Sequence, residues 1–239
     1  MKRISIIFLM SIITSCHSQD KDKPSKKKTT TTTTTSERIN LELPINPKTM
    51  QTHTTEEFTE QDIQKYKKNK IDGGYEYTRA DGAKVLETDD ELILFTRDIT
   101  PENSLFTLSK EYHPNRRLWM KYNHFVNGGF IKGVFYEYDE SGKLTKAEDY
   151  DKPFKFTWEH VKKYIEQDLK LDFFKDEVNI NNYNGLSGGK PTWDINFKGN
   201  YKDVFGVYYV TLDGKDGELL KVKKILGRDG EQQIIFEKK

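Results

Sequence analysis

The chain has 239 residues, 32% of them charged and 34% hydrophobic, and its formal net charge is +1. Its 16 glycines and 7 prolines exclude collagen-like and Pro/Gly-rich low-complexity classes, and the balanced charge provides no general attraction to nucleic acid or to an anionic membrane. Aromatic residues make up 13% of the chain, and only Phe8 among them precedes residue 58. The sequence therefore predicts that the chain after residue 57 buries a core.

The N-terminus has the pattern of a bacterial export signal. Two basic residues precede an apolar stretch over 4–13, which is too short to span a bilayer because a spanning helix needs about 20 apolar residues. Residues 13–16 read Ile-Thr-Ser-Cys and resemble the lipobox of bacterial lipoproteins, whose cysteine carries fatty acids such as palmitate and begins the mature chain. We predict a signal peptide over 1–15 and lipidation at Cys16. The alternatives are an ordinary secretory signal with a stray cysteine and the hydrophobic start of a cytosolic protein.

The next segment has the composition of a spacer. Cys16 is the only cysteine, which excludes an intramolecular disulfide and a Cys-rich zinc site. Residues 16–57 show no hydrophobic periodicity, and seven consecutive threonines occupy 29–35. We predict a lipidated cysteine and a disordered tether over 16–57, with a reach of roughly 30–35 Å. The lysines before the threonines are either solvated or in contact with phosphate head groups.

The region 58–152 is predicted to begin with a short helix and to continue as strands. The helix is expected over 57–68, with Thr59 as its N-cap and Asp62 at the capping-box position. Its buried face is expected to contain Ile63 and Tyr66. Short alternating segments then follow one another, separated by turns rich in Gly, Asn and Asp, which indicates an antiparallel β-meander.

One stretch of this meander resembles a known repeat. Residues 129–144 read GFIKGVFYEYDESGKL, and their glycine and aromatic positions resemble one unit of the MORN-type repeats. The resemblance implies an elongated sheet that binds partners and has no chemistry of its own.

Residues 153–239 are predicted to form a helix followed by antiparallel strands. Over 156–169, apolar residues recur at spacings of three or four and form one face: Trp158, Val161, Ile165 and Leu169. Together with the later segment 207–220, VYYVTLDGKDGELL, this order of elements resembles a PepSY-like domain over 155–225. That resemblance implies protein binding, in some members protease inhibition, and no fixed catalytic residues. The predicted fold class is α+β: an antiparallel β-meander followed by a helix packed on a small antiparallel sheet.

The sequence contains no motif for a particular reaction. The loop 213–218 fails the EF-hand pattern because Lys215 and Gly217 stand where calcium needs oxygen ligands. The histidines lack metal-ligand spacing, and neither a nucleophile elbow nor a phosphate-binding loop is present. We therefore expect no enzyme activity, no cofactor and no metal.

The expected function is that of a lipid-anchored protein-binding module of the bacterial cell envelope, periplasmic or surface-exposed, with an immunity protein or an inhibitor as particular roles. The expected partners are the membrane, through the N-terminal lipid, and another protein, but no nucleic acid. The alternative is a carbohydrate-binding or hydrolytic envelope lipoprotein. It would use aromatic residues expected to be exposed on the first sheet: Trp119, Tyr122, Tyr136 and Tyr138. A purely structural envelope component is the third hypothesis.

Overall fold

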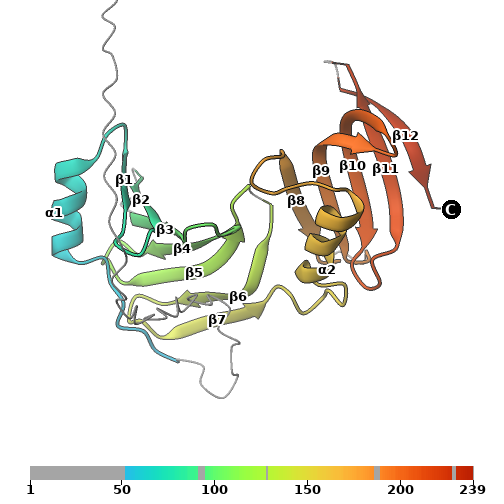
Figure 1. Ribbon diagram of the computed structural model, residues 1–239. Helices are drawn as coiled ribbons and strands as arrows, with labels where there is room; N and C mark the ends of the chain where they lie inside the picture. The colour runs from blue at the N-terminus through green and yellow to red at the C-terminus, as the bar shows by residue number, and fades with distance from the viewer. Residues whose placement is uncertain (1–51, 91–94, 128, 186–188, 228–229, 239) are drawn as a thin grey trace, which may run out of the picture. The chain divides into compact units, whose positions relative to one another are not determined.

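The structure is a computed structural model (Figure 1). It describes residues 52–90, 95–127, 129–185, 189–227 and 230–238. All of these residues belong to one compact unit, Pro44–Lys239. The predicted signal peptide, Cys16 and the tether up to residue 51 lie outside the described residues. Within them, antiparallel strands dominate, accompanied by two short α-helices and one π-helical turn.

The first sheet has seven antiparallel strands whose spatial order is their order in the chain. They are β1 (Gly74–Thr78), β2 (Lys84–Asp89), β3 (Phe95–Thr100), β4 (Phe106–Tyr112), β5 (Leu118–Phe125), β6 (Ile131–Tyr138) and β7 (Leu144–Asp149). The predicted β-meander is therefore confirmed. Local turn chemistry explains it: in the β6–β7 turn, Asp139 accepts hydrogen bonds from the backbone N–H groups of Ser141 and Lys143, and Gly142 takes a φ of +88°.

Helix α1 (Glu60–Asn69) forms much as its sequence predicts. Thr59 is the N-cap and makes the reciprocal capping box with Asp62, while Ile63 and Tyr66 are the buried positions. These two side chains join a hydrophobic cluster on the first sheet, whose other buried members are Phe58, Phe95, Tyr112, Leu118 and Tyr138. The helix is thus held by packing as well as by its cap.

The segment before α1 pairs with the turns of the first sheet. The Thr54 N–H donates to the carbonyl of Gly142 at 2.7 Å, and the Leu118 N–H donates to the carbonyl of Glu56 at 2.9 Å. Residues of the predicted tether between 52 and 57 therefore pair with the first sheet, and the boundary predicted at residue 58 stays a prediction. Composition cannot reveal such pairing, because the partners lie more than sixty residues away in the chain.

The second sheet has five antiparallel strands in the order β12-β11-β10-β9-β8. They are β8 (Val178–Tyr183), β9 (Thr192–Tyr201), β10 (Val204–Asp213), β11 (Leu219–Leu226) and β12 (Glu231–Glu237). The expected single helix over 156–169 is instead α2 (Trp158–Lys163), followed by the π-helical turn η2 (Tyr164–Asp168). The four apolar positions predicted for its inner face are all buried.

A second hydrophobic cluster contains residues of α2, η2 and the second sheet. Phe125 at the end of β5 and Phe130 before β6 also belong to it. The ring of Phe130 lies 5.1 Å from that of Trp193, and the ring of Phe125 lies 5.5 Å from that of Trp158. These contacts join residues from both sides of position 152, and both sides belong to the same compact unit. The domain boundary predicted at position 152 stays a prediction.

Candidate functional site

The four aromatic residues predicted as a binding surface do not lie together on one exposed face. Trp119, Tyr122 and Tyr136 are half-buried, whereas Tyr138 is 6% exposed and packs in the cluster beneath α1. Tyr122 stacks on Phe135, which precedes Tyr136 in β6. Since adjacent residues of a strand point to opposite faces, Tyr122 and Tyr136 belong to different faces of the sheet. A binding role for the four as one surface stays a prediction, and the burial of Tyr138 argues against its membership.

Three further features are the predicted lipidation site, metal-binding groups and membrane-spanning helices. Cys16 lies outside the described residues. Within the described ranges, no group of His, Cys, Asp and Glu is arranged to hold a metal ion. The helices found there are too short or too polar to cross a membrane.

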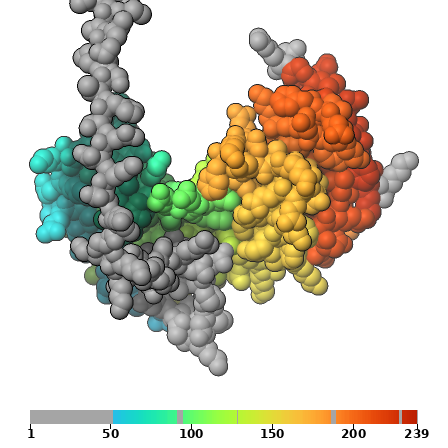
Figure 2. All heavy atoms as spheres, viewed as in Figure 1, coloured from blue at the N-terminus to red at the C-terminus, as the bar shows by residue number. Residues whose placement is uncertain are grey.

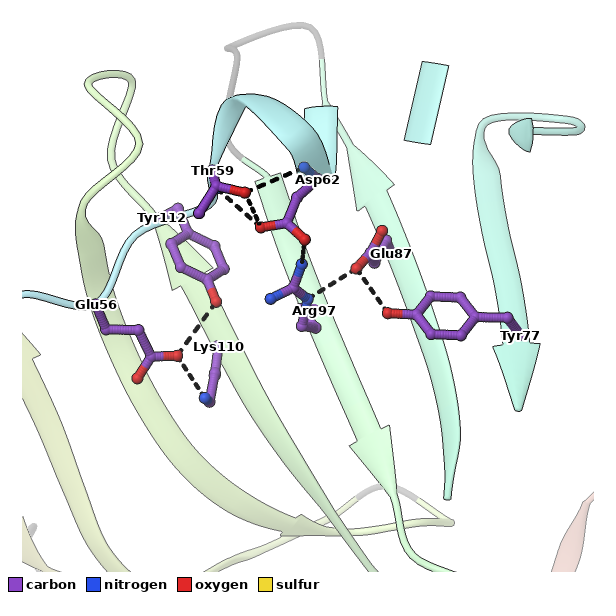
Figure 3. Close-up of polar contacts among 8 residues, drawn as sticks. All are labelled: Glu56, Thr59, Asp62, Tyr77, Glu87, Arg97, Lys110 and Tyr112. Carbon is purple, nitrogen blue, oxygen red and sulfur yellow. Dashed lines mark hydrogen bonds and ion pairs between the residues drawn. The ribbon is translucent and has the colours of Figure 1, made fainter. Parts of the chain in front are cut away.

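A polar cluster joins α1 to the first sheet (Figure 3). At its centre, Arg97 of β3 donates from Nε to Glu87 Oε1 at 2.8 Å and forms an ion pair with Asp62 Oδ1 at 2.9 Å. Its guanidinium also lies 4.7 Å from the centroid of the Phe58 ring, in cation–π contact. One side chain thereby connects β2, β3, the N-terminus of α1 and the segment that precedes it.

Glu87 is the unusual member of the polar cluster, because it is a carboxylate that is only 1% exposed. Its Oε1 accepts hydrogen bonds from Arg97 and, at 3.1 Å, from the hydroxyl of Tyr77. Its Oε2 is buried and has no hydrogen-bond partner among the described residues. Burial and the negative charge of Glu87 together raise the pKa of Tyr77 to about 12.

The remaining contacts of the polar cluster fasten the segment before α1. Glu56 forms an ion pair with Lys110 of β4, and the hydroxyl of Tyr112 lies 3.5 Å from the same carboxylate. Burial opposes ionisation of Asp62, yet its hydrogen bonds from Thr59 and the charge of Arg97 lower its pKa. The charges of the polar cluster thus hold α1 and its flanking segment on the sheet, and we assign it a structural role.

A run of exposed apolar residues lies at the edge of the second sheet. Among the described strands, β12 pairs with β11 alone and forms one edge of the sheet (Figure 1). All seven of its residues are exposed. Ile234, Ile235 and Phe236 are 53%, 41% and 39% exposed. In the space-filling view, the red strands at the C-terminal end of this sheet lie at the surface (Figure 2). Other exposed apolar or aromatic side chains of the same sheet are Tyr183, Val204, Phe205, Tyr209 and Leu226.

Sequence reasoning missed both the polar cluster and the edge strand as features of interest, although each leaves a signal. In β2 the buried Val85 and the buried Glu87 are two residues apart, so a charge occupies a core position of an alternating strand. In β12 three consecutive apolar residues interrupt the expected alternation of a half-exposed strand.

Comparison of the chain with family models, curated proteins and solved structures gave no match. The resemblance of 129–144 to MORN-type repeats and that of 155–225 to a PepSY-like domain therefore stay predictions.

Proposed function

We propose that the protein is a lipid-anchored, protein-binding module of the bacterial cell envelope. The lipid on Cys16 holds it at the membrane, and the edge of the second sheet at β12 binds an extended strand of a partner protein. The signal and lipobox pattern of residues 1–16 supports the first half of this proposal. The exposed strand β12 is the observation that carries the second half.

The argument from β12 rests on where its apolar side chains lie. Ile234 is paired with Lys223 of β11, whereas Phe236 is paired with the buried Val222. Because Lys223 and Val222 are adjacent in their strand, the apolar side chains of β12 extend over both faces of the sheet. Ile235 lies at the register shift between them and is left without a partner in β11.

Such a strand suits an interior position in a sheet. Natural edge strands are usually protected by charges, proline or a covering element, since their unpaired N–H and C=O groups recruit other strands. Three of the seven residues of β12, Ile234–Phe236, are apolar and lie on both faces, which is typical of a strand covered by neighbours. Addition of a partner strand would satisfy the outer peptide groups of β12 and cover its exposed side chains.

We further propose that residues 153–239 act as one helix-on-sheet unit of α+β type, which supports this edge. Val161 of α2 and Ile165 of η2 are fully buried and share a hydrophobic cluster with Ile195 and Val210 of the sheet. A rigid backing of this kind keeps an edge strand extended in the absence of its partner, which lowers the entropic cost of binding.

The nature of the partner defines the role. A toxin bound at β12 makes the protein an immunity lipoprotein, and an envelope protease makes it an inhibitor. Both roles need recognition without chemistry, which agrees with the expectation of no enzyme activity.

The experiment compares two isoleucine-to-lysine variants. Ile234→Lys places a charge on β12, while Ile71→Lys places the same charge on a side chain that is 77% exposed and lies before the first sheet. Partner captured from envelope extracts of the producing cells should fall by about tenfold or more with Ile234→Lys, the scale of a binding hot spot, and stay unchanged with Ile71→Lys. Equal capture by the wild type and both variants would refute binding through β12.

A further inference from the structure

The second sheet has one face toward its hydrophobic cluster and one face toward solvent. In β10, Tyr208 and Val210 are buried and belong to the cluster that also contains residues of α2 and η2. Because successive residues of a strand point to opposite faces, the residues between and before them point away from the cluster. Two of these, Phe205 and Tyr209, are 64% and 40% exposed. We call the face to which they belong the outer face.

The outer face has an apolar centre flanked by lysines. In the register of β9, β10 and β11, Val207 lies between Lys198 and Ile225. Two residues further along β10, Tyr209 is opposite Lys223 of β11. These side chains therefore form one continuous surface, which we name the outer patch. Its members are Phe205, Val207, Tyr209, Ile225, Lys198 and Lys223.

The charge of the outer patch is positive. Within the described residues, neither Lys198 nor Lys223 takes part in an ion pair. The acids of the same face, Asp194 and Glu237, lie one row further along the register and are already bonded to other side chains. The β9–β10 turn contributes one lysine and one aspartate, whose charges cancel. The balanced charge of the whole chain thus conceals a locally basic surface with an apolar centre.

This combination suits the interface of an anionic bilayer. Tyrosine concentrates at membrane interfaces because its ring is apolar and its hydroxyl is polar. Lysine buries its stem against apolar surface and keeps its ammonium group beside lipid phosphates. A protein partner fits less well, since protein interfaces are enriched in arginine and depleted in lysine, and both cations of the outer patch are lysines. We propose that the outer patch docks on an anionic phospholipid surface, with Phe205 as the inserted side chain.

This contact is separate from the interactions of the proposed function. It needs no lipid on Cys16, because its attraction comes from exposed side chains of the second sheet. It needs no strand added at β12 either, because the peptide groups of an edge lie in the plane of a sheet and the outer patch lies on its face. Each lysine beside an anionic surface strengthens binding about fivefold, so docking by the outer patch alone is weak and reversible.

A fluorophore attached to the outer patch tests the proposal. Cys16 is the only cysteine of the chain, so Phe205→Cys combined with Cys16→Ala provides a single thiol for an environment-sensitive dye. Phe174→Cys in the same background is the matched control, because Phe174 is 65% exposed and follows Phe173, which is buried in the cluster on the other face. The probe is vesicles of phosphatidylcholine and phosphatidylglycerol in equal amounts. The emission of the dye at position 205 should move to shorter wavelength, and that of the dye at position 174 should not. Equal responses at the two positions, or no response at position 205, would overturn the proposal.

Removal of charge tests the electrostatic part with the dye at position 205. Lys198→Gln combined with Lys223→Gln should weaken binding to these vesicles by about tenfold or more. The control, Lys67→Gln combined with Lys68→Gln in the last turn of α1, should leave it unchanged. Vesicles of phosphatidylcholine alone should bind more weakly than the anionic vesicles. Equal binding to both kinds of vesicle, or a dye that responds to an acidic protein and not to anionic vesicles, would contradict docking on lipid.

Discussion

Replacing Arg97 by methionine should destabilise the protein more than any single exposed charge can. The substitution removes both ion pairs of Arg97, to Glu87 and to Asp62, and its cation–π contact with Phe58. Glu87 would remain 1% exposed, with the Tyr77 hydroxyl as its one hydrogen-bond partner among the described residues. Breaking a buried pair in this way costs about 3–5 kcal/mol, against a total stability of roughly 5–15 kcal/mol for a folded domain.

Urea unfolding of four proteins tests this magnitude: the wild type, Arg97→Met, Glu87→Leu and the double variant. The double variant should be more stable than Arg97→Met alone, because it no longer buries an unpaired charge. Arg79→Met is the control, since the ion pair of Arg79 with Asp81 is solvent-exposed and should contribute less than about 1 kcal/mol. A loss below about 1 kcal/mol for Arg97→Met, or a double variant less stable than Arg97→Met, would refute the reasoning.

Four further predictions concern particular side chains. Trp158 is 5% exposed, and Trp158→Ala should lower the free energy of unfolding in urea by about 3–5 kcal/mol. Lys162→Ala, on the outer side of α2, should lower it by less than about 0.5 kcal/mol. Equal losses for the two variants would mean that α2 is not packed by the face that contains Trp158. Gly129→Ala should lower Tm strongly, because a Cβ at its φ of +100° would come within 1.8 Å of a backbone carbonyl oxygen of β8, and an unchanged Tm would contradict this close approach. Burial raises the pKa of Tyr77 to about 12, so its protonated hydroxyl contributes stability that is present below pH 10 and is lost as pH rises toward 12. Ultraviolet titration of tyrosinate should show one tyrosine ionising near pH 12 that is absent from the titration of Tyr77→Phe. Cys16→Ala should abolish incorporation of a labelled fatty acid, whereas a wild-type protein that takes up no label would exclude the lipid anchor.

The features that the sequence predicts well are those decided by neighbouring residues. The capping box depends on Thr59 and Asp62, which are three residues apart. The buried face of the helix depends on Ile63 and Tyr66, which are also three residues apart. The turns of the meander are likewise decided within four residues, by side chains such as Asp139 and by glycines at positive φ. The order of the strands in both sheets follows from these short connections.

The features that the sequence does not predict depend on long-range register. The pairing of Glu87 with Arg97 follows from their positions opposite each other in β2 and β3. The outer patch of the second sheet needs the pairing of β9, β10 and β11, which places Lys198 and Ile225 on either side of Val207. The exposure of β12 could be known only once it was placed at an edge, because a run such as Ile234–Phe236 is equally compatible with a central strand.

Photo-crosslinking in the producing cells tests the central claim, binding of a partner strand at β12, most directly. A photoreactive amino acid is placed at position 234 in one protein and at position 71 in another, both being exposed isoleucines in the wild type. Binding through β12 predicts one discrete protein adduct at position 234 and none of that mass at position 71. No adduct at position 234, or the same adduct at both positions, would contradict it.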